Sequence, residues 1–254
     1  MSDILVHEQG GVCTLTLNRP DKKNSLTSSM YAELANLFTQ AQENPSVRVL
    51  VIQGSETVFC AGNDISDFIE NPPSTLQSPV FKFLQALVQF PKPLIAAVCG
   101  PAVGIGTTLL FHCDLVYAGD NAVFSMPFVN LGISPEAASS ILAPQVMGYQ
   151  RAAQALLFGE PFMAEAAMEA GLVNQIIPPT ELKDFVQRQA LKLAAKPLKS
   201  VLETKILLKG HLIPEMQKRV KEEGEIFSKM LTEPAALEAM KAFKEKRKPD
   251  FTGL

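Results

Sequence analysis

The chain has 254 residues, of which 47% are hydrophobic and 19% charged, and its 23 lysines and arginines against 26 aspartates and glutamates give a net charge of −3. This composition is typical of a soluble globular protein with one large core, and it excludes disordered and collagen-like chains. Because a nucleic-acid-binding domain normally carries a basic surface, we expect no nucleic-acid partner.

The first fifth of the chain predicts a hairpin, a helix and a buried strand. Residues 3–17 form two runs of strand-forming residues around the turn pair Gly10-Gly11, and alternation in the second run predicts one buried face. Apolar residues at helical spacing predict a helix over 27–43. The continuous apolar run 47–52 then predicts a strand that is buried on both faces.

The middle of the chain continues the alternation of helix and strand. We expect a helix at 79–90, a strand at 94–98, and short strands near 115–117 and 123–124. Strands that alternate with helices indicate a parallel or mixed α/β core.

Residues 94–113 could also be considered a membrane span, because they are long enough and almost free of charge. The pair Gly100-Pro101 in the middle of this run argues against a continuous helix. We therefore interpret it as a buried strand followed by a buried helix, and expect no membrane partner.

Beyond residue 134 the pattern is almost wholly helical, interrupted at 172–177. We therefore divide the chain into an α/β core over 1–195 and a helical region over 196–254. The helices of the second region carry apolar stripes that must pack against the core or against a neighbouring subunit.

The cysteines and histidines predict no metal or redox cofactor. The four cysteines form no C-x-x-C pair and the three histidines share no ligand spacing. Free thiols are typical of a reducing compartment. Since the chain shows neither a secretory signal at its start nor S-K-L at its end, we expect a cytoplasmic location.

Two loops after buried strands carry small residues, at 60–64 and 100–106. Such loops can expose backbone N–H groups that bind an anionic oxygen, and two converging groups would form an oxyanion hole. The alternative, that the glycines serve only turns and packing, stays open at this point. Neither the dinucleotide nor the phosphate-loop motif is complete here.

The segment LGISPEAASS predicts a helix start with Ser134 as N-cap, Pro135 as first helical residue and Glu136 in the first turn. The helix dipole alone would explain an acid there. The neighbouring residues, however, are apolar or small and include no cation, and burial among such residues would instead raise the pKa of Glu136. The residues themselves favour neither interpretation.

Five ordered segments together resemble the crotonase (enoyl-CoA hydratase/isomerase) superfamily. This resemblance implies a spiral of ββα units with a helical trimerisation region, an acyl-CoA thioester substrate, and a homotrimer or a dimer of trimers. Coenzyme A would be part of the substrate, so no separate cofactor is expected. The segments are LTLNRPDKKNSL at 15–26, VFCAGNDISDF at 58–68, PKPLIAAVCGPAVGIG at 91–106, HCDLVYAGDNAVFSMPFVNLGISPE at 112–136 and GEPFMAEAAMEAGLVNQIIP at 159–178.

The resemblance also assigns roles at the reacting end. It implies an oxyanion hole formed by the N–H groups of Asn63 and Ile105. Family hydratases carry two glutamates at the positions where this chain has Thr108 and Phe128. We therefore expect that hydration is not the main activity. Glu136 instead matches the single glutamate of peroxisomal-type 3,2-enoyl-CoA isomerases, which implies Δ3,Δ2-enoyl-CoA isomerisation in fatty acid β-oxidation.

Three alternatives stay open: a dienoyl-CoA isomerase, an enoyl-CoA hydratase, and a non-catalytic acyl-CoA-binding module. For the phosphates of coenzyme A, the basic candidates are Arg19, Lys22, Lys23 and the cluster at 241–248. The resemblance implies that substrate-binding residues lie on loops at both ends of the pocket. They are Lys23, Asn24, Leu26, Cys60, Ala61, Gly62, Asp64, Ile65, Gly104, Phe128 and Leu131.

Overall fold

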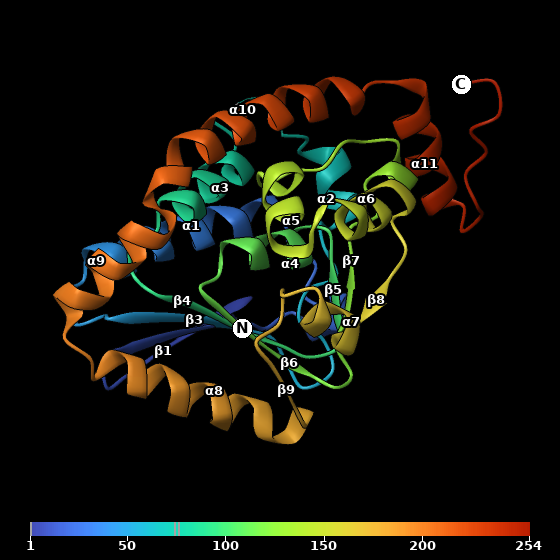
Figure 1. Ribbon diagram of the computed structural model, residues 1–254. Coiled ribbons are helices and arrows are strands. Elements are labelled where there is room, and N and C mark those ends of the chain that lie inside the picture. Colours follow the sequence, from blue (N-terminus) through green and yellow to red (C-terminus); the bar gives the residue numbers. More distant parts are fainter. Residues whose placement is uncertain (1, 74, 76) are drawn as a thin grey trace.

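The computed structural model describes residues 2–73, 75 and 77–254 (Figure 1). Its strands form a six-stranded sheet in the order β1-β2-β3-β4-β6-β9 and a three-stranded sheet in the order β5-β7-β8. The strands are β1 (Ile4–Gln9), β2 (Val12–Leu17), β3 (Val49–Gln53), β4 (Leu94–Val98), β5 (Pro101–Val103), β6 (Leu115–Gly119), β7 (Val123–Ser125), β8 (Phe162–Met163) and β9 (Gln175–Ile177).

Helices make up most of the rest of the chain. The α-helices are α1 (Ser28–Glu43), α2 (Ile65–Glu70), α3 (Pro79–Gln89), α4 (Ile105–Thr108), α5 (Ser139–Met147), α6 (Tyr149–Phe158), α7 (Ala164–Glu169), α8 (Pro179–Ala194), α9 (Leu198–Lys209), α10 (Ile213–Met230) and α11 (Pro234–Lys244). Short 3-10 helices are η1 (Pro20–Lys22), η2 (Leu109–His112), η3 (Val129–Leu131) and η4 (Gly210–Leu212).

The large sheet combines one antiparallel pair with parallel pairs. The hairpin β1–β2 is antiparallel, as predicted, and β2, β3, β4, β6 and β9 pair in parallel. The mixed α/β class is therefore confirmed. Two short strands, β5 with three residues and β8 with two, were not predicted, because such runs are too short to show a periodicity.

The sheet lies between two helical layers (Figure 1). Helix α8 covers one face, and α1 and α3 cover the other, with α10 packed outside α3. The prediction of one buried face for the second hairpin strand is wrong: Leu15 packs in the main core, while Val12 packs in a second cluster with residues of α8. A single strand pattern cannot show that a helix more than 150 residues later covers the other face.

The helices predicted at 27–43 and 79–90 are confirmed with nearly the same bounds. Thr27 caps α1 by accepting a hydrogen bond from the Met30 N–H at 3.3 Å. The run 94–113 forms buried strands and short helices, as expected. Among the described residues, no helix is both long and apolar enough to cross a membrane.

After residue 196 the chain is helical, in α9, α10 and α11, while a domain boundary at 195/196 stays a prediction. Helix α10 approaches α3 closely at Gly224, where an added Cβ would lie 2.3 Å from Cε1 of Phe81. The close contact requires a residue without a side chain at this position.

We expect Gly224→Ala to destabilise the fold by about 2 kcal/mol, because the added methyl group overlaps the Phe81 ring. At a solvent-exposed position inside a helix, the change from glycine to alanine would instead stabilise the fold by about 1 kcal/mol. The sign of the change in unfolding free energy, measured by chemical denaturation, therefore tests the contact. A more stable variant would contradict it.

Candidate active site

The two small-residue loops of the sequence lie against each other. Cys60 and Ala102 form a parallel bridge, in which the Val103 N–H donates to the Cys60 carbonyl at 2.9 Å. Gly106 makes the contact possible, because a Cβ there would lie 2.6 Å from the same carbonyl oxygen. The loop after β3 and the start of α4 are thus fixed relative to each other.

Each loop presents a free backbone donor to one pocket. Within the described part of the chain, the N–H groups of Asn63 and Ile105 donate no hydrogen bond, and both residues line the same cavity. Ile105 is the first residue of α4, so its N–H has no partner within the helix. Gly104 reverses the chain just before it with φ of +55°. Two such donors can bind one developing oxyanion.

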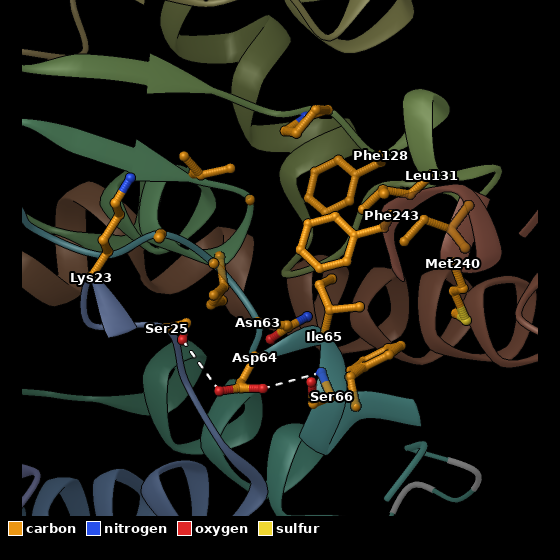
Figure 2. Close-up of a pocket in the computed structure, with 18 of the residues that line it drawn as sticks. Lys23, Ser25, Asn63, Asp64, Ile65, Ser66, Phe128, Leu131, Met240 and Phe243 are labelled. Atoms are coloured by element: carbon orange, nitrogen blue, oxygen red, sulfur yellow. Dashed lines mark hydrogen bonds between the residues drawn. The ribbon is translucent and has the colours of Figure 1, made fainter. Parts of the chain in front are cut away.

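The cavity between these donors has a volume of about 550 Å³. In Figure 2 the rings of Phe128 and Phe243 lie beside each other, with Leu131 and Met240 near them, and Lys23 projects from the opposite side. The pocket therefore has an apolar wall and a basic edge. The predicted substrate-binding residues that line it are Lys23, Ala61, Gly62, Asp64, Ile65, Gly104, Phe128 and Leu131.

Three further predicted substrate-binding residues lie behind the pocket wall, outside its lining. Asn24 is buried and its amide donates to the Phe59 carbonyl at 3.0 Å. Leu26 and Cys60 are buried and pair with neighbouring loop backbone. These three residues shape the loops that carry the donors, and the structure shows no surface of theirs in the pocket.

The basic candidates differ in their availability. Arg19 forms a 2.7 Å ion pair with Asp64, and in the 241–248 cluster Arg247 pairs with Glu238. Lys22 and Lys23 line the pocket. The two lysines are therefore better placed than the two arginines to reach a phosphate group.

Glu136 lies in a second, small cavity of about 10 Å³, and its side chain is buried, with 6% exposure. Asn63 and Phe68 line both this cavity and the large pocket, so the carboxylate lies just beyond the donor loop. The Thr108 hydroxyl donates to Glu136 Oε1 at 3.0 Å. Burial raises the pKa of Glu136 to about 8; the Thr108 hydrogen bond lowers it and the charge of Glu223 raises it further.

The predicted helix start at Ser134 and Pro135 is wrong, because α5 begins at Ser139. Ala137 and Ala138 adopt left-handed φ values of +61° and +55°, which no regular helix contains. Glu136 therefore precedes the helix, and the dipole explanation for an acid in its first turn does not apply. Sequence could not show this, since alanine normally favours helix.

The chain around Glu136 is held by buried hydrogen bonds. A ring nitrogen of His112 lies 2.7 Å from the Ala137 carbonyl oxygen, and the Ser139 hydroxyl donates to the Glu136 carbonyl at 2.6 Å. His112 is buried, and burial lowers its pKa to about 3, so the ring is neutral. The position of the carboxylate is thus fixed from several sides.

Sequence reasoning missed Tyr31, which lies on α1 far from the motifs. Its hydroxyl donates to Oδ1 of Asn63, and burial raises its pKa well above the ordinary value. The charge of Glu136 raises this pKa as well. The helical pattern of this segment carries no signal for the polar partner of Tyr31.

A mixed α/β chain that places two free N–H groups from adjacent loops beside a buried carboxylate has the features of a crotonase-type enzyme. The family model for enoyl-CoA hydratase/isomerase matches residues 7–254. The chain belongs to the enoyl-CoA hydratase/isomerase (crotonase) family.

Solved structures and curated relatives agree with this family. The structure of Pseudomonas aeruginosa OdaA is 45% identical, with a TM-score of 0.93 over 96% of this chain and 99% of that one. Enoyl-CoA hydratase/isomerase from Pseudoalteromonas atlantica T6c is 37% identical, with a TM-score of 0.94 over 99% and 100% of the two chains.

Among the curated relatives, enoyl-CoA delta isomerase 2 of Rattus norvegicus is 37% identical over 81% of this chain, which spans only 54% of that protein. The 2,3-dehydroadipyl-CoA hydratase of Escherichia coli is 34% identical over the full length of both chains. Relatives of similar identity thus bear the names of an isomerase and of a hydratase, so the reaction must be argued from the site.

Proposed function

We propose that the protein is a Δ3,Δ2-enoyl-CoA isomerase, which moves a double bond of an acyl-CoA from C3 to C2. The observation that carries this proposal is the buried Glu136 carboxylate, which lines the small cavity beside the donor loops. Among the described residues that line the two cavities, Glu136 and Asp64 are the acidic ones. Asp64 accepts hydrogen bonds from Arg19 and from the first turn of α2, so Glu136 is the available base.

The proposed reaction is a 1,3-proton transfer. The N–H groups of Asn63 and Ile105 bind the thioester oxygen, which acidifies the C2–H bond and stabilises the dienolate once the proton leaves. The Glu136 carboxylate takes the proton from C2, and the C3–C4 double bond shifts as the new carboxylic acid returns a proton to C4. One acid–base group suffices, because the substrate gains and loses the same number of protons.

Hydration is disfavoured by the same geometry. Water addition needs a second acid–base group, and the position where family hydratases resemble one another in having a glutamate holds Thr108, whose hydroxyl is engaged with Glu136. The position of the second hydratase glutamate holds the buried Phe128. Together with Leu131 and Ile133, this ring lines the pocket with apolar surface that excludes water from the dienolate.

The direct test is incubation of the purified protein with a 3-enoyl-CoA and spectrophotometric detection of the conjugated 2-enoyl thioester. We expect accumulation of the 2-enoyl product with little 3-hydroxyacyl-CoA. Predominant formation of the 3-hydroxy product from a 2-enoyl-CoA would identify a hydratase instead. Binding of both esters without conversion would identify a non-catalytic module.

The pH dependence provides a further prediction. Because the base must be ionised in the free enzyme and its pKa is raised to about 8, kcat/KM should rise with pH and level off above about 8. A pH series of initial rates with a 3-enoyl-CoA measures this limb. A profile that is already flat at pH 5–6 would contradict a buried glutamate base.

We also propose assembly into trimers or dimers of trimers, supported by apolar side chains that α9 leaves exposed. Ile206, Leu207 and Leu208 are 53%, 80% and 73% exposed in the single chain. Contiguous apolar patches mark interaction surfaces. The molecular mass measured by sedimentation equilibrium should be three or six times the 27.6 kDa mass of one chain. A monomer at micromolar concentration would contradict the proposal.

A further inference from the structure

A second buried carboxylate lies near Glu136 and takes no part in the proposed reaction. Glu223, on α10, is 5% exposed. Its Oε2 accepts a hydrogen bond from the Ala138 N–H at 2.6 Å, and its Oε1 accepts one from the Ser140 N–H at 3.1 Å. Burial raises the pKa of Glu223 overall, while the hydrogen bonds that both oxygens accept from backbone donors lower it and favour the ionised carboxylate.

We propose that Glu223 is a positioning residue for the Glu136 base: through its hydrogen bonds to Ala138 and Ser140 it holds the left-handed turn that places Glu136, and it adds a second buried carboxylate close to the base. This inference rests on the proposed function for its effect on turnover. Its structural part, the coupling between the two carboxylates, does not depend on any substrate.

The turn needs an external support. Ala137 and Ala138 both adopt positive φ, a conformation that costs an alanine about 1 kcal/mol or more. The N-cap of α5 is Ala138, whose methyl group cannot accept a hydrogen bond from the first turn. Glu223, on another helix, accepts instead from the N–H of Ala138 and from that of Ser140 in the first turn. It also places a negative charge at the N-terminus of α5, where the helix dipole favours one.

The neighbouring Gly224 allows the Glu223 carboxylate to approach the turn at Ala138. At Gly224 helix α10 lies directly against the Phe81 ring, as described above. Gly224 lines the small cavity together with Glu136 and Ala137, so this part of α10 borders the space that holds the base. A bulkier residue at 224 would push α10 away and withdraw the acceptors.

The charges around the pair are few. Burial raises the pKa of Glu223, and the charge of Arg219 on the same helix lowers it; Arg219 also donates to the Ser140 hydroxyl at 3.3 Å. Burial and the charge of Glu136 raise the pKa values of Tyr31 and Cys60, so both are neutral. The charge of Glu223 raises the pKa of Glu136, in addition to the larger effect of burial. A base with a higher pKa accepts a carbon-bound proton more readily.

The test is Glu223→Gln, with Glu225→Gln as the matched control. A glutamine keeps one acceptor but sets an NH₂ group against the second N–H, and it removes the charge. Glu225 is exposed on the same helix, where its loss removes an equal charge from the solvent side. We expect Glu223→Gln to lower the plateau kcat about tenfold with KM changed less than about twofold, and to shift the acid limb to lower pH. Glu225→Gln should do neither.

Carbon-13 NMR of the glutamate carboxyl groups tests the coupling without substrate. In Glu223→Gln the titration midpoint of Glu136 should fall, and in Glu136→Gln that of Glu223 should fall by the same coupling. The second variant keeps the test decisive if Glu223→Gln fails to fold. Unchanged midpoints in the folded variants, or a plateau kcat equal to that of the wild type, would overturn the inference. A wild type that does not isomerise 3-enoyl-CoA would refute the proposed function, while the titrations would still decide the coupling.

Discussion

Replacement of Glu136 by glutamine is expected to lower kcat for conversion of 3-enoyl-CoA to 2-enoyl-CoA by about 10⁴-fold. Glutamine has the same size and can still accept the Thr108 hydrogen bond, but it cannot take a proton from C2 or return one to C4. The two N–H donors are unchanged. Substrate binding, measured by calorimetry with a non-reactive saturated acyl-CoA, should therefore remain within about threefold of the wild type.

The same variant should differ in its pH-dependent stability. Burial raises the folded-state pKa of Glu136 from its ordinary value of 4.5 to about 8, so stability associated with this group is complete below pH 4.5 and is lost as pH rises through about 8. Glutamine removes this loss. Glu136→Gln should be more stable than the wild type at pH 8 to 9 in chemical denaturation, whereas equal stability across this range would indicate a solvated carboxylate.

The second large effect is expected from Ile105→Pro, which deletes one of the two oxyanion donors. Ile105 is the first residue of α4, a position where proline fits the backbone because the N–H has no helical partner. Loss of one preorganised donor costs about 10²–10³-fold in kcat. Initial rates with a 3-enoyl-CoA, at saturating substrate, measure the loss.

Ile105→Ala is the matched control, because it also removes the buried side chain but keeps the N–H. Both variants lose side-chain packing, which should lower the melting temperature of both. Only the proline variant should lose most of its kcat. If the alanine variant were equally inactive, the side chain rather than the N–H would carry the effect.

The large elements could be predicted because their patterns are local. The hairpin, α1, β3, α3 and β4 follow from alternation, helical spacing and turn residues within windows of about 18 residues. The short strands β5 and β8 depend on partners that are distant in sequence. The same holds for the second face of β2, which α8 buries. No local pattern encodes such contacts.

For the candidate site, the resemblance pointed to the segments that line the pocket, but physical detail decided what each residue does. Asn24 was predicted to bind substrate and instead donates to loop carbonyls. Glu136 was predicted inside a helix and lies before it, because two alanines adopt the left-handed region. Tyr31 and Glu223 had no sequence signal, since their roles depend on contacts across 32 and 85 residues of chain.

The lining of the large pocket extends from Lys22 on η1 to Phe243 on α11. During synthesis, a ribosome-bound chain that lacks α11 has the donor loops, Phe128 and Leu131, but not Met240 and Phe243 of the apolar wall. Ligand affinity should therefore increase when the last helix has docked. Bound acyl-CoA should in turn stabilise the whole domain against unfolding, including its C-terminal helix.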